Sequence, residues 1–158
     1  MKYKNNMRSS EGFSLLELIM VLAMVTMMGS LAVPVYAQYA TRAGLVETTI
    51  RLANWSREFH RWEMNNGRFP NDSHIVLPPE AVRTLNIVNS EWLAPTALGG
   101  NWNWEGVGAY DYVGISIVGA TASISDISQL DSILDDGDLS QGVFRQTPNG
   151  RYTYILEE

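Results

Sequence analysis

A short acidic segment near the carboxyl end combines residue types and spacing that could bind a metal ion. Asp135, Asp136 and Asp138 place three carboxylates around Gly137, and Ser140 follows. Carboxylate, hydroxyl and backbone carbonyl oxygens are the ligands that Ca²⁺ prefers, although the spacing of an EF-hand loop is absent. The segment therefore predicts either a small Ca²⁺ site or a helix that ends at Gly137 and continues as a solvated acidic loop.

A second candidate for chemistry is a single acid inside an apolar run. Residues 13–36 contain one charged side chain, Glu17. A carboxylate costs roughly 2.5–3.5 kcal/mol at the centre of a membrane, so we expect this residue to have a function. If the chain is cut between Gly12 and Phe13, the new α-amino group titrates near about 7.7–8.0 and is largely cationic at neutral pH. We expect Glu17 to pair with the Phe13 amine of a neighbouring subunit, because this cancels two costly charges in apolar surroundings.

No enzyme signature accompanies these residues. The sequence has no GxSxG, HExxH, P-loop or glycine-rich dinucleotide motif. It has no cysteine, which excludes disulfides, thiolate metal sites and cysteine nucleophiles. His60 and His74 lie in unlike contexts without a second metal ligand at helical spacing. The sequence predicts a protein without enzymatic activity.

The apolar run is long enough to cross a membrane. As a helix it spans about 36 Å, against a hydrocarbon core of about 30 Å. Residues 1–12 before it carry three basic residues and one acid, whereas residues 67–158 carry 4 Arg and 12 acids. This asymmetry predicts a single pass through the membrane with the body exported. A buried core helix can be equally apolar, but the basic leader favours the membrane.

Three fates of the apolar run fit the residues. The first is a signal peptide cleaved after Ala37, which would leave a mature chain starting at Gln38. The second is a permanent single-span anchor. The third is a precursor cut before the run, between Gly12 and Phe13. Glu17 favours the third fate, because that cut creates the amine with which its carboxylate can pair.

The segment Gly12-Phe13-Ser14-Leu15-Leu16-Glu17 resembles the class III signal of type IV pilins and type II secretion pseudopilins. The resemblance implies cleavage after Gly12 by a prepilin peptidase, N-methylation of Phe13, and storage in the inner membrane before entry into a helical filament. Pro34 lies where this family commonly has a helix-kinking proline. Glu11 departs from the pattern, because a basic residue is common before the glycine.

The residues after the apolar run predict that the same helix continues as an amphipathic helix. Two rows of residues repeat every seven positions: Leu45, Leu52 and Phe59, and Thr48, Trp55 and Trp62. The pattern predicts one helix from near Ser14 to Asn66, bent at Pro34 and weakened at Gly44. Its apolar stripe predicts either the surface that seats a sheet, which we favour, or an exposed recognition face.

The rest of the chain predicts a small antiparallel sheet with short helices. Strand patterns occur at Asn101–Glu105, Tyr110–Val118, Val143–Gln146 and Tyr152–Leu156. The first two and the last two are each joined by a turn, which predicts two hairpins. Short helices are predicted from Pro79 to Leu85 and from Ser125 to Asp135.

The predicted fold class is α+β. A long N-terminal helix, whose first half spans the membrane, carries a small antiparallel β-sheet head packed on its second half. The predicted segments are a leader at 1–12, a transmembrane helix at 13–36, an amphipathic continuation at 37–66 and the globular α+β head at 67–158.

We predict a structural subunit, a pseudopilin, of a pilus-like filament of a type II secretion system, with its head in the periplasm. The resemblance implies self-association and contacts with other pseudopilins, the prepilin peptidase and an inner-membrane assembly platform. Some major pseudopilins have a Ca²⁺ site in their C-terminal loops, so the resemblance adds support to a Ca²⁺ site at Asp135, Asp136 and Asp138, although we favour the solvated acidic loop.

Two alternatives to a pseudopilin stay open. One is a type IV pilin or minor pilin for adhesion, motility or DNA uptake. The lack of cysteine weighs against it, because many pilins close their C-terminal region with a disulfide. The acidic head weighs against direct binding of nucleic acid. The other is a membrane-anchored or secreted module whose aromatic hairpin binds a ligand.

Overall fold

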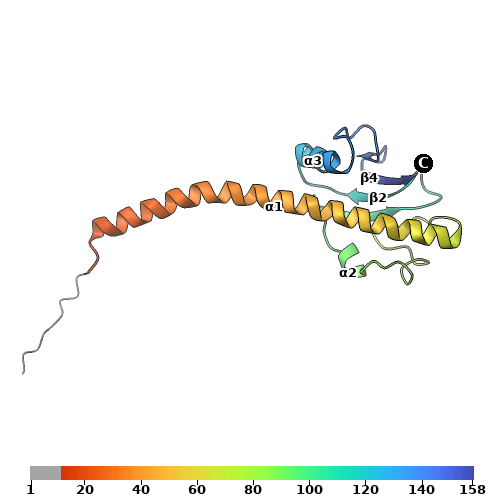
Figure 1. Ribbon diagram of the computed structural model, residues 1–158, viewed down its shortest axis with the longest axis horizontal. Helices are drawn as coiled ribbons and strands as arrows, with labels where there is room; N and C mark the ends of the chain where they lie inside the picture. Colours follow the sequence, from red (N-terminus) through yellow and green to blue (C-terminus); the bar gives the residue numbers. More distant parts are fainter. Residues whose placement is uncertain (1–11) are drawn as a thin grey trace, which may run out of the picture. The chain divides into compact units, whose positions relative to one another are not determined.

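The computed structural model describes residues 12–158 (Figure 1). The predicted leader, apart from Gly12, lies outside the described residues. The chain divides into two compact units, one ending at Tyr39 and one covering Ala40–Glu158. Helix α1, Leu15–Asn66, contributes to both units and confirms the predicted single long helix.

The first part of α1 is apolar and exposed. Its 18-residue window of highest hydropathy has a mean hydropathy of 2.2, and none of that window is buried within the protein. The backbone stays helical through Pro34, although proline supplies no backbone donor there. The bend expected at Pro34 stays a prediction. An exposed apolar helix of this length can cross a membrane.

The second part of α1 carries the core stripe. Its buried residues follow the predicted spacing: Leu45, Thr48, Leu52, Trp55, Ser56, Phe59 and Trp62. Phe59 stacks on Trp104 with 3.7 Å between the ring centroids and an angle of 2° between the planes. Trp55 meets Trp102 edge to face at 4.8 Å. The stripe therefore seats the sheet, as predicted, and is not an exposed recognition face.

Gly44 is a point of close packing, which explains why the helix retains a glycine there. A Cβ atom built on Gly44 would lie 2.8 Å from the Cβ atom of Ala97, closer than carbon atoms normally approach. The predicted weak point does not interrupt α1. The helix gives up some intrinsic propensity at Gly44 and gains close contact with the loop that carries Ala97.

The sheet has four antiparallel strands in the order β1-β2-β4-β3, and Figure 1 labels the two central strands, β2 and β4. The strands are β1 Asn101–Glu105, β2 Val113–Val118, β3 Phe144–Gln146 and β4 Tyr152–Glu157. Both predicted hairpins are present. Strand β2 begins three residues later than predicted, because Tyr110 and Tyr112 stack on each other in the preceding loop. The outer edge of β1 is bridged by His74, whose carbonyl accepts a hydrogen bond from the Trp104 amide at 3.0 Å.

The connecting segments differ in part from the predictions. Residues 79–85 form consecutive turns and not a helix, with hydrogen bonds such as Thr84 N–H to Ala81 O at 2.9 Å. The amide of the next residue, Asn86, donates to the Glu58 side chain at 2.9 Å, so the ladder of a helix does not continue. A short helix that was not predicted, α2 Asn89–Trp92, follows. Helix α3, Ile124–Leu134, agrees with the prediction within one residue at each end.

Candidate functional site

Helix α3 places an aspartate in the protein interior. The side chain of Ser123 caps the helix by accepting a hydrogen bond from the Asp126 amide at 3.1 Å. Ile127 and Leu130 then point into the core. Asp131 follows on the same side of the helix, and its exposed fraction is 0%. A carboxyl group is thus buried where the helical period places an apolar residue.

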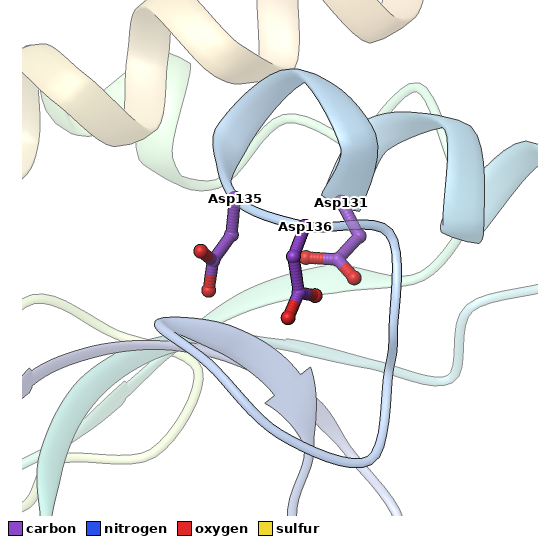
Figure 2. A group of neighbouring side chains, drawn as sticks. All are labelled: Asp131, Asp135 and Asp136. Carbon is purple, nitrogen blue, oxygen red and sulfur yellow. The ribbon is translucent and has the colours of Figure 1, made fainter.

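Three carboxyl groups meet at the end of α3. Figure 2 shows Asp131 in the last turn of the helix and Asp135 and Asp136 just beyond it. One oxygen from each of the three lies within 4.8 Å of the others. Both carboxyl oxygens of Asp131 are buried, and among residues 12–158 neither has a hydrogen-bond partner of normal geometry; the Gly137 amide stabilises the carboxylate only weakly. Buried polar atoms are normally paired, so this arrangement needs an explanation.

The loop after α3 is folded around the other two carboxylates. Asp135 accepts a hydrogen bond from the Val143 amide. Asp136 accepts from the Asp138 amide at 2.8 Å and from the Gln141 side chain at 3.2 Å. At Gly142, φ is 81° and a Cβ atom would lie 1.9 Å from an Asp135 oxygen, so only glycine fits this approach. These contacts hold Asp135 and Asp136 in place beside Asp131.

The cluster concentrates negative charge in a small volume. Burial, followed by the charges of Asp136, Asp135 and Asp138, raises the pKa of Asp131 to about 6. The last turn of α3 contains no basic residue, and the C-terminal end of a helix itself carries partial negative charge. A cation with hard-oxygen preference would satisfy the Asp131 oxygens and offset this charge.

The structure brings together only two of the three predicted metal ligands. Asp135 and Asp136 are in the cluster, but the Asp138 carboxylate accepts hydrogen bonds from the Ser140 hydroxyl at 2.7 Å and amide at 3.0 Å. These bonds lower the pKa of Asp138. Asp131 was missed by the sequence analysis. The signal that could have found it is an acid at the apolar positions of α3, four residues after Ile127 and four before Asp135.

A second buried carboxylate, that of Glu105 at the end of β1, is the centre of a hydrogen-bond network. Glu105 has an exposed fraction of 0%. It accepts hydrogen bonds from Arg151 at 2.7 Å, Asn149 at 2.9 Å, Ser116 at 3.0 Å and Thr153 at 3.3 Å. The Arg151 ion pair compensates its charge. With its oxygens occupied by protein donors, Glu105 holds the β3–β4 turn against the sheet and has no capacity left for a metal.

The predicted processing and assembly residues lie at the start of the described chain. Gly12 and Phe13 precede α1 and are exposed, and Glu17 lies in the first turn of α1. Among residues 12–158, none has an atom within 4 Å of a Cβ atom built on Gly12. The geometry leaves these residues accessible, while their roles in cleavage, methylation and assembly stay predictions.

Comparisons with known proteins found type IV pilins that are similar to this chain in sequence and in structure. It is 26% identical over 76 residues to a type IV major pilin protein PilE1 of Neisseria gonorrhoeae, a match that covers 46% of this chain and 46% of the relative. A second PilE1 sequence of that organism is also 26% identical over 76 residues, covering 42% of its length. The chain thus spans less than half the length of the curated relatives it matches. No protein-family model matches the chain.

A solved structure has the same fold. The major type IV pilin PilA1 from Clostridium difficile superposes with a TM-score of 0.54 at 12% sequence identity, over 75% of this chain and 97% of that one. A long N-terminal helix with an apolar first part, joined to an antiparallel sheet, is therefore a fold that this chain shares with a type IV pilin. The chain therefore has the fold of a type IV pilin and is similar in sequence to type IV major pilins over 76 residues.

Proposed function

We propose that this chain is a structural subunit of a pilus-like filament. The observation that carries the proposal is the exposed apolar first part of α1, joined to a folded head that has the type IV pilin fold. An exposed apolar helix is costly in water, so it needs a membrane before assembly and other helices afterwards. In this role the head is exported and α1 supplies both the anchor and the packing surface.

The finer assignment is a pseudopilin of a type II secretion system in the inner membrane. It is supported by the absence of cysteine and by the class III signal at residues 12–17. In this proposal a prepilin peptidase cuts after Gly12, Phe13 is N-methylated, and subunits join other pseudopilins through an assembly platform. The second candidate is a pilus subunit, which is favoured by the names of the curated relatives.

Processing and assembly are tested by two variants of the full chain. Gly12→Asp should leave the leader attached, because a charged side chain beside the scissile bond disfavours a confined protease site. Glu17→Val should be processed and inserted normally, since the span becomes more apolar, but should form few filaments. Thr26→Val is the matched control, because it also makes the exposed first part of α1 more apolar and leaves Glu17 intact. Efficient leader removal in the first variant, or normal filament yield in the second, would contradict the proposal.

We also propose that Asp131, Asp135 and Asp136 bind a divalent cation, with Ca²⁺ as the best fit. The observation that favours this is the buried Asp131 carboxyl group without a hydrogen-bond partner of normal geometry in the described chain. The bound ion would link the end of α3 to the loop that leads into β3. Binding to the folded state alone adds about 2.7 kcal/mol of stability at ~100 times the dissociation constant.

Thermal unfolding of the full chain in detergent tests the cation proposal. Millimolar Ca²⁺ should raise the melting temperature relative to EDTA, and Mg²⁺ at equal ionic strength should do so much less. Asp131→Asn should abolish the Ca²⁺ shift while raising the melting temperature in EDTA, because it removes an uncompensated buried charge. Asp138→Asn is the matched control and should keep the shift. Equal melting curves in Ca²⁺ and EDTA would refute the site.

A further inference from the structure

An open groove lies at the C-terminal end of α1. None of the residues that line it belongs to the proposed cation site or to the apolar first part of α1. It encloses about 340 Å³. Three parts of the chain form it: the end of α1 with the turn after it, the loop between β1 and β2, and the end of β4. The residues that matter here are Glu63, Arg68, Tyr110, Asp111, Tyr112 and Glu157.

Two tyrosines form an aromatic wall of the groove. The rings of Tyr110 and Tyr112 stack with centroids 5.3 Å apart and planes 13° from parallel. The Tyr112 hydroxyl accepts a hydrogen bond from Asn149 at 3.1 Å, and Asn149 is held in turn by the buried Glu105. Tyr110 keeps 38% of its surface exposed. Tyr112 is thus held in place through Asn149, whereas Tyr110 remains open to solvent. The face of a tyrosine ring attracts cations.

The groove also carries uncompensated negative charge. Its rim has four acids, including Asp111, Glu157 and Glu158, against one cation, Arg68. Arg68 is turned toward Glu80 at 3.3 Å, and Glu158 pairs with Arg145. Within residues 12–158 no cationic side chain forms an ion pair with Asp111 or Glu157. The chemistry of the groove therefore fits a cationic side chain with a flat, hydrogen-bonding head, which is arginine.

The opposite end of the same unit supplies an arginine of this kind. Residues 40–66 carry 4 Arg and 3 acids, in contrast to the acidic remainder of the head. Arg42 is exposed and forms no ion pair within the described part of the chain. It lies 24 residues before Asn66 on one helix, about 36 Å along the axis. A chain therefore cannot place Arg42 in its own groove.

We propose that the groove receives the Arg42 side chain of a second copy of this chain. The guanidinium would lie over the exposed face of Tyr110 and donate hydrogen bonds to Asp111 and Glu157. The contact joins two different surfaces, so each copy uses its groove for one neighbour and its Arg42 for another. Such a heterologous contact generates an open helical array when its rotation does not close into a ring, as the proposed filament requires. The inference rests on the proposed filament function and adds to it a specific contact between heads.

Cysteine cross-linking tests the contact, because the natural chain has no cysteine and only the introduced thiols react. Full-length Asp111→Cys and Arg42→Cys chains with different epitope tags are produced in the same cells and treated with a bis-maleimide whose spacer is about as long as an arginine side chain, because the proposed contact leaves the two backbones too far apart for a direct disulfide. The heterodimer should be several times more abundant than either homodimer. The matched control replaces Arg42→Cys by Arg83→Cys, because Arg83 is also exposed and without an ion pair in residues 12–158. That pair should give no excess heterodimer.

A charge exchange supplies the second readout. Asp111→Arg should lower filament yield roughly three- to tenfold, and Arg42→Asp in the same chain should restore it. If wild-type filaments form but neither the heterodimer excess nor the restoration is seen, the contact is refuted while the filament function stands. Equal trapping by Arg83→Cys also refutes it. If the wild-type chain forms no filaments that sediment, the filament function and the contact both fail.

Discussion

The buried Glu105–Arg151 pair allows a quantitative prediction about the stability of the head. Glu105 has no exposed surface, whereas the Arg151 side chain is 20% exposed. We consider Glu105→Ala, Arg151→Ala and the double variant. Removal of one partner from a buried ion pair leaves an uncompensated charge and typically costs about 3–5 kcal/mol. The partial exposure of Arg151 places both single variants near the lower value, about 3 kcal/mol.

The hydrogen bonds around Glu105 determine how the two variants combine. Glu105→Ala leaves Asn149, Ser116 and Thr153 without the acceptor that they share. Arg151→Ala leaves the carboxylate buried with only those neutral donors. The double variant loses both charges together, so its cost should fall short of the sum of the single variants by at least about 1 kcal/mol. A domain of this size has only about 5–15 kcal/mol of stability, so the losses are large.

Denaturant unfolding of the full chain in detergent, followed by tryptophan fluorescence, measures these losses. All five tryptophans are buried in the compact unit Ala40–Glu158 and report on its core. Glu91→Ala is the control, because Glu91 is exposed and should change stability by less than about 0.5 kcal/mol. A cost below about 1 kcal/mol for Glu105→Ala, or strictly additive single variants, would refute the compensation described for this pair.

Three further predictions follow from other contacts. Gly44→Val should destabilise the head by about 1–3 kcal/mol through its clash with Ala97, and Ala97→Gly in the same chain should recover part of this loss in a denaturant titration. Ser123→Ala should cost about 1 kcal/mol by removing the α3 cap, whereas Ser125→Ala in the same helix should be nearly neutral. In EDTA, stability should fall as pH rises from about 4 through about 6, because the raised pKa of Asp131 lets the folded state keep a proton that the unfolded state has lost; an unchanged slope in Asp131→Asn would contradict this assignment.

The fold could be predicted from the sequence where one strong pattern determined each element. The stripe that includes Leu45, Leu52 and Phe59 predicted both the length of α1 and the face that meets the sheet. The NWNWE segment predicted β1, because its alternation matches the period of a strand. The helix predicted at residues 79–85 was wrong, because the helix-starting preference of Pro79 does not determine whether the following amides bond within the segment or, like Asn86, to a side chain of α1. Local propensity could not foresee that the Tyr110–Tyr112 stack shortens β2.

The candidate sites were less accessible to sequence reasoning. Proximity in sequence selected Asp138, but the turn around Ser140 directs its carboxylate to local donors. Asp131 enters the cluster through the helical period and through burial, which depends on how α3 packs. The Glu105 network joins residues more than 40 positions apart, such as Asn149 and Arg151. Only the register of the sheet brings such residues together.

The two edges of the sheet affect whether copies of this protein can associate strand to strand. Strand β1 has part of its outer edge occupied by the His74 bridge, and β3 at the other edge is only three residues long. Both features leave little free backbone for an added strand. In the proposed filament role many copies come close together, and these edges would then disfavour uncontrolled strand-to-strand growth. Ordered association then depends on side-chain surfaces and on α1, which separate by modest changes in conditions more readily than a continuous sheet does.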